Sequence, residues 1–159
     1  MNVEAFVLAR ALHVVAVVAW IGGVAFVTTV LLPALRASSD ARGRLAQFEL
    51  LEGRFAWQAR VTTVLAGLSG FYMLHFLQAW DRYSQAQYWW IHLMTGVWLV
   101  FSLVLFVLEP LFLHRYFHEL AMRDDARAFT LVQRMHTVLL SVSLLAVAAA
   151  VLGAHGLLN

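Results

Sequence analysis

The feature that most limits how this chain can fold is an apolar run from Ala11 to Pro33, whose one ionisable side chain is His13. About 20 apolar residues are enough to cross the roughly 30 Å hydrocarbon core of a bilayer, so the run predicts a membrane-spanning helix. Hydrocarbon penalises ionisable groups, and a histidine inside such a helix is therefore a functional-site hypothesis. The partner of His13 has to come from elsewhere in the chain.

Three more apolar runs follow, and with the first they predict spans at about 7–35, 56–79, 88–113 and 131–156. The chain is 62% hydrophobic and only 13% charged, which is typical of an integral membrane protein. Short connections between the runs predict an all-α, antiparallel four-helix bundle that forms a single domain over 1–159. Ser38-Ser39-Asp40 predicts a turn and a helix cap in the first connection.

Arginine placement predicts the orientation in the membrane. All 11 basic residues are arginines, and only Arg10 and Arg82 lie outside the first and third connections and the helix ends beside them. Cytoplasmic loops carry the excess of basic residues, so we expect both termini to face outward from a bacterial inner membrane. The basic character thus reflects topology, and we expect membrane lipid and no nucleic acid as a partner.

Small residues predict where the helices approach closely. They recur at helical spacing in Ala66-x-x-x-Gly70 of the second span and in Ala146-x-x-x-Ala150-x-x-x-Ala154 of the fourth. Such ladders allow backbones to pack tightly in membranes, either within the chain or between copies of it in a homo-oligomer.

The histidines separate into two groups by depth. His13, His75, His92 and His155 fall on the outer side of the predicted bundle, whereas His114, His118 and His136 fall on the cytoplasmic side. His13 and His92 lie deepest in the outer group, at matching depth, while His75 and His155 are closer to water. A single interfacial histidine is commonly an anchor or a polar group with a hydrogen-bond partner. The pair His13 and His92, both within apolar spans, instead predicts two ligands of a cofactor.

An apolar slot with two facing imidazoles is what a haem b requires. Helical spacing puts His13, Val17 and Trp20 on one face of the first span, and puts Thr95 and Leu99 with His92 on the third. We therefore predict one haem b ligated by His13 and His92, walled by Trp20, with Arg10 or Arg82 near the propionates. His75 could replace either ligand.

The cytoplasmic histidines are weaker candidates. His136 is the better buried of them and could meet Glu109, His114 or a second cofactor, whereas His114-x-x-x-His118 fits a solvated helix face. Cysteine is absent, which excludes disulfides, thiolate metal sites and covalent haem attachment.

Three segments resemble the HemJ-type protoporphyrinogen oxidases and the membrane domain of the CopD-type copper-resistance proteins. They are Ala11-Leu-His13 through Trp20-Ile-Gly22-Gly23, Leu51-Glu52-x-Arg54 with the following span, and Trp90-Ile-His92. The HemJ resemblance implies a small four-helix membrane protein that binds haem b, oxidises a porphyrinogen and passes electrons toward the respiratory chain. The CopD resemblance implies copper handling in or across the membrane.

The chain departs from the HemJ pattern at two places. Met94 stands where the resemblance implies a lysine, and Met135-His136-Thr137 stands where it implies Asn-Glu after an aromatic residue. These departures remove the groups that would bind substrate and move protons, so the resemblance implies haem binding more firmly than porphyrinogen oxidation.

Three functional hypotheses follow from the sequence. The first is a haem b protein that transfers electrons near the outer face to or from a quinol, a periplasmic donor or a respiratory-complex subunit. The alternatives are a HemJ-like or other haem-dependent oxidoreductase, and a copper-handling protein or cofactor-free accessory subunit. No hydrolytic or phosphate-binding motif is present, and whether the chain is an enzyme is left open.

Overall fold

Helices make up every regular element of the residues that this computed structural model describes, 2–37 and 41–158. In chain order the elements are α1 (Val3–Phe26), η1 (Val27–Leu31), α2 (Leu32–Ala37), α3 (Ala41–Phe76), η2 (Trp80–Ser84), η3 (Ala86–Tyr88), α4 (Trp89–Leu103), η4 (Val104–Leu113), α5 (His114–Arg123) and α6 (Asp125–Ala154). The predicted all-α class is confirmed. The turn predicted at Ser38-Ser39-Asp40 lies outside the described residues.

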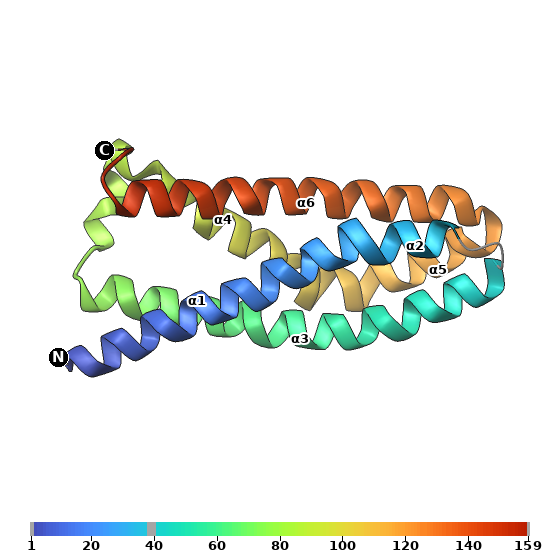
Figure 1. The fold of residues 1–159 in the computed structure, drawn as a ribbon, viewed down its shortest axis with the longest axis horizontal. Coiled ribbons are helices and arrows are strands. Elements are labelled where there is room, and N and C mark those ends of the chain that lie inside the picture. Colours follow the sequence, from blue (N-terminus) through green and yellow to red (C-terminus); the bar gives the residue numbers. More distant parts are fainter. Residues whose placement is uncertain (1, 38–40, 159) are drawn as a thin grey trace.

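Consecutive helices join into long rods that run alternately in opposite directions (Figure 1). α1, η1 and α2 form the first rod, α3 the second, α4, η4 and α5 the third, and α6 the last. Both chain termini lie at one end of the molecule, which we call the termini end (Figure 1). α2 and α5 lie at the other end, which we call the loop end.

Three helical stretches within the described residues are long and apolar enough to cross a membrane: Val3–Ala37, Ala86–Arg123 and Asp125–Ala154. They correspond to the predicted spans 7–35, 88–113 and 131–156. The predicted span 56–79 falls largely in α3, which is not among the three. α3 begins with a polar half, and its membrane placement stays a prediction.

Both prolines of the chain lie where a helix widens into π-helical turns. The backbone N–H of Leu32 bonds to the carbonyl of Val27, and that of His114 bonds to Glu109, each five residues back. By the same five-residue spacing, the backbone N–H at position 33 would bond to the carbonyl of Thr28, and that at position 110 to the carbonyl of Leu105. Both positions are proline, which has no N–H to donate. The carbonyls of Thr28 and Leu105 are therefore left without their helical partner.

Side chains from neighbouring rods satisfy these two carbonyls. Gln133 of α6 donates from Nε2 to the carbonyl oxygen of Thr28 at 2.8 Å, and Arg60 of α3 donates from Nε to that of Leu105 at 3.0 Å. Arg60 also forms an ion pair with Glu109. A proline in an apolar helix is tolerated when neighbours pair the freed backbone groups, so each widened turn also joins two rods.

Small residues form the buried face of α6. Ser143, Ala146, Ala149 and Gly153 are buried there, and a Cβ on Gly153 would overlap the Trp90 indole of α4. Of the predicted ladder, Ala146 is buried on this face, Ala150 is partly buried and Ala154 is exposed. Close packing of α6 therefore uses a face turned slightly from the predicted one.

We expect Arg60→Met to lower the stability of the folded protein by about 1–3 kcal/mol, because it leaves the Leu105 carbonyl and the Glu109 carboxylate without their partner. The midpoint of thermal unfolding in detergent measures the change. Arg54→Met, at an exposed position of the same helix, is the control. Adding Pro110→Ala to Arg60→Met should recover part of the lost stability, since this second substitution restores a backbone N–H that can donate to the Leu105 carbonyl. Equal unfolding midpoints for Arg60→Met and Arg54→Met would contradict this account.

Candidate functional site

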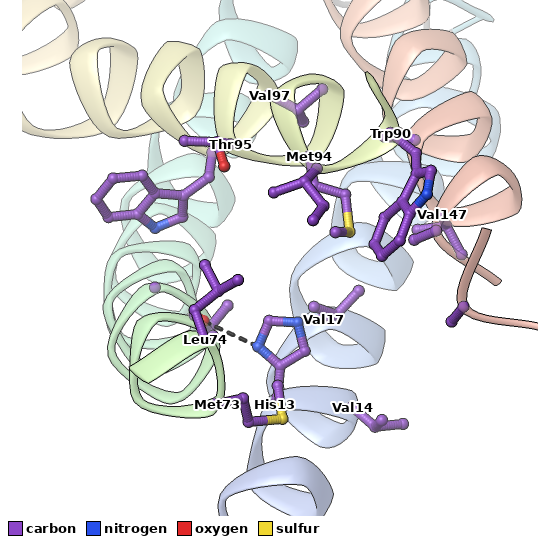
Figure 2. Close-up of a pocket in the computed structure, with 18 of the residues that line it drawn as sticks. His13, Val14, Val17, Met73, Leu74, Trp90, Met94, Thr95, Val97 and Val147 are labelled. Carbon is purple, nitrogen blue, oxygen red and sulfur yellow. Dashed lines mark hydrogen bonds between the residues drawn. The ribbon is translucent and has the colours of Figure 1, made fainter. Parts of the chain in front are cut away.

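A cavity of about 730 Å³ lies at the termini end, between α1, α3, α4 and α6. Its wall is mostly apolar, and its volume is in the range of sites for small molecules and cofactors. The guanidinium and imidazole groups among its lining residues are those of Arg10, His13, Arg82 and His155. Figure 2 shows the part of this cavity around His13.

The His13 ring is held by one of its two nitrogens. Nδ1 lies 2.9 Å from the carbonyl oxygen of Ala66 and 3.1 Å from Oγ of Ser69. A carbonyl only accepts, so Nδ1 carries the proton and Nε2 of the neutral ring keeps its lone pair. Nε2 makes no hydrogen bond to the described residues, and it points away from α3 into the cavity (Figure 2).

The sequence of α3 explains why the ring can lie there. Ala66, Ser69 and Gly70 are spaced as neighbours on one helix face. A Cβ at Gly70 would be 3.2 Å from Cε1 of His13, so a side chain there would crowd the ring. The close approach predicted for Ala66 and Gly70 is thus confirmed, and its partner is the histidine of α1.

Three of the other predicted site residues line the same cavity: Arg10, Trp20 and Arg82. Trp20 is 4% exposed, and its ring meets Phe101 edge-on with centroids 4.8 Å apart. The Trp20 indole N–H has no acceptor among the described residues. The guanidinium carbon of Arg10 lies 5.4 Å from the centre of the Phe6 ring, so that cation sits at the edge of an apolar wall.

His92 and His75 do not line the cavity. Both are exposed, and His92 lies on the outer side of α4 with Leu99, which is 54% exposed. The His92 ring contacts Tyr83 edge-on, with centroids 5.2 Å apart. Tyr83 itself lines the cavity and bonds to Thr95 of α4, with the two hydroxyl oxygens 2.7 Å apart. The structure therefore separates His92 from His13 by the wall of the cavity.

His136 lies outside the cavity as well. Its Nδ1 is 3.0 Å from the carbonyl oxygen of Val132, one turn back in the same helix. Neither Glu109 nor His114 bonds to it in the described part of the chain.

Two methionines line the cavity that sequence reasoning did not place there. Met73 comes from α3 and Met94 from α4, and Figure 2 shows both around the His13 ring. The sequence did contain a signal for Met94. Ile91, Met94, Thr95 and Trp98 follow helical spacing and all line the cavity, but the neighbouring stripe through His92 is equally apolar and drew the prediction instead.

No group of three or more His, Asp or Glu side chains within the described residues could hold a metal ion. The four histidines predicted on the outer side are divided by the structure: His13 and His155 line the cavity, and His75 and His92 do not.

Comparison with known proteins adds no assignment, since no protein-family model, curated protein or solved structure matches this chain.

A charged cluster lies toward the loop end, away from the cavity. Glu52 of α3 precedes the predicted span 56–79, and its carboxyl is partly buried. Burial, with a smaller contribution from the nearby negative charges of Glu109 and Glu49, raises the pKa of Glu52 to about 7. Arg60 pairs with Glu109 and His118 with Glu49 at 2.7 Å, so these two neighbours already have partners.

We expect the stability of the protein to fall as pH rises from about 5 to 7. The pKa of Glu52 is higher in the folded chain than its ordinary value of 4.5, so folding binds a proton that is lost over this range. Glu52→Gln carries no charge at any pH, and it should be more stable than the native chain at pH 8 and nearly equal to it at pH 5. Unfolding midpoints at the two pH values measure this, with the exposed Glu119→Gln as control; a pH-independent difference would contradict it.

Proposed function

We propose that the chain is a four-span protein of a bacterial inner membrane with both termini outward. The outer faces of the helices are apolar, with Leu8, Val15, Val18 and Leu145 each about two-thirds exposed. A helix that is apolar on all sides suits a lipid environment. The termini end carries Arg10 and Arg82, and the other arginines favour the loop end as the cytoplasmic side.

The cavity is proposed to bind one haem b, with His13 as an axial ligand. The observation that carries this proposal is the state of the His13 ring: Nδ1 donates to a backbone carbonyl, and Nε2 is free toward an apolar cavity. Histidines that ligate metals almost always donate their other ring N–H in this way, which fixes the ring and its tautomer. Haem needs only axial ligands from the chain, so two facing side chains are enough.

The remaining cavity residues suit the rest of such a cofactor. Trp20 and Val17 supply apolar wall on the His13 helix, and Arg10 lies one turn outward from His13. Arg10 and Arg82 are the cations available for carboxylate groups at the termini end. Each now lies over an aromatic ring, Arg10 over Phe6 and Arg82 over Tyr88, so each is positioned by packing.

Electron transfer is the activity that these residues support best. A haem supplies one-electron oxidation and reduction. No carboxylate is among the described residues that line the cavity, and Met94 occupies the position where a porphyrinogen oxidase of the HemJ type is expected to have lysine. We therefore favour exchange of electrons with a quinol or a respiratory-complex subunit over porphyrinogen oxidation.

Copper handling is the second candidate, and a specific observation favours it. Met73, Met94 and His13 line one cavity, and thioether sulfur with imidazole nitrogen is a ligand set that binds Cu(I). The two candidates share His13 and differ in the bound group. Metal and haem analysis of one purified sample separates them.

We expect the detergent-purified chain from haem-replete cells to show a sharp reduced α band, with about one haem per chain. His13→Ala should abolish haem incorporation and leave membrane insertion intact, because it removes the axial nitrogen. His75→Ala, an exposed histidine outside the cavity, is the matched control and should retain haem. A colourless native chain, or His13→Ala with a full haem content, would refute the haem proposal; stoichiometric copper in its place would support the second candidate.

A further inference from the structure

The rotation of α4 about its axis decides which of its side chains faces His13. Residues two apart in a helix point about 200° apart, so His92 and Met94 cannot both face the cavity. Met94 lines the cavity, and His92 is exposed on the outer side of the helix. Trp98, which follows Met94 by one turn, also faces inward, and its Nε1 donates to the carbonyl oxygen of Thr63 at 2.9 Å.

This orientation of α4 is fixed by contacts on both sides of Met94. Gly67 of α3 gives the Trp98 ring its place, since a Cβ at Gly67 would lie 2.6 Å from that ring. Thr95 bonds to Tyr83, as described above. Turning His92 inward would break both hydrogen bonds and push Trp98 out of its place against α3.

Met94 also lies on the correct side of the imidazole. Nδ1 and Nε2 lie on different edges of the ring, and Nδ1 bonds to α3, so a metal on Nε2 lies away from α3. Met73 comes from α3 itself, whereas Met94 comes from α4, across the cavity. Figure 2 shows the Met94 side chain extending from α4 into the cavity, with its sulfur on the side toward the His13 ring.

We infer that Met94 is the second axial ligand, so that the haem is held by His13 from α1 and Met94 from α4. This inference rests on the haem proposal above. A thioether is a neutral, soft ligand, and histidine–methionine ligation raises the reduction potential of a haem relative to ligation by two histidines. His92 is then free of the iron and serves as a contact of Tyr83.

The test uses the full chain, purified in detergent with its haem. The ferric native protein should show the near-infrared charge-transfer band that a thioether-ligated low-spin haem gives and a bis-imidazole haem lacks. Met94→Leu should keep the haem on His13, lose this band, become high-spin and bind carbon monoxide when reduced. Met94→His should remain low-spin, lose the band and show a lower reduction potential, because an imidazole replaces the sulfur.

Two matched variants control for general damage to the cavity. Met73→Leu removes the other thioether of the cavity, and His92→Ala removes the exposed imidazole of the same helix; both should keep the band and the native potential. A haem-loaded native chain without the band, a Met94→Leu variant that retains it, or a His92→Ala variant that turns high-spin would overturn the assignment and leave the haem proposal standing. A native chain that takes up no haem would overturn both.

Discussion

The hydrogen bond from His13 to the carbonyl of Ala66 determines what the cavity can do. It holds α1 against α3 and fixes the tautomer of the His13 ring with the proton on Nδ1. The lone pair of Nε2 is then left free in apolar surroundings. A polar group in such a place costs free energy unless something binds to it. The small residues of α3 favour this bond, because a Cβ at Gly70 would lie 3.2 Å from Cε1 of His13 and crowd the ring that reaches the backbone.

The same requirement, that polar groups find partners away from water, explains the two widened turns. Pro33 and Pro110 each remove a donor, and Gln133 and Arg60 each replace it from a neighbouring rod. Arg60 therefore has a structural use inside the bundle, although positive residues near spans are usually assigned to topology alone. Polar residues in the first half of α3 also have partners on neighbouring rods, since Arg44 pairs with Asp125 and Glu49 with His118.

Much of this could be predicted from the sequence, and the reason for the rest is physical. Apolar run length predicted the helices, and the depth of His13 within its run predicted it as a site residue, which the structure places at the cavity. The orientation of α4 could not be predicted in this way. The helix face through His92 and the face through Met94 are both apolar. Hydrophobic periodicity therefore cannot tell which of the two faces points into the bundle. Tertiary contacts of Trp98 and Thr95 decide between them. The widened turns depend likewise on side chains distant in sequence.

The two ends of the molecule differ in how closely their side chains pack. At the loop end Phe48, Phe117 and Phe129 pack with centroids 4.9–5.6 Å apart, and Arg44 pairs with Asp125 at 2.5 Å. The termini end instead holds the cavity of about 730 Å³. This cavity is open on one side, so in a membrane its apolar wall would lie against lipid or against a bound group. A lipid chain would match the apolar wall but would offer nothing to Nε2 of His13, and this is why we propose a haem, whose iron would bind that nitrogen, rather than lipid alone.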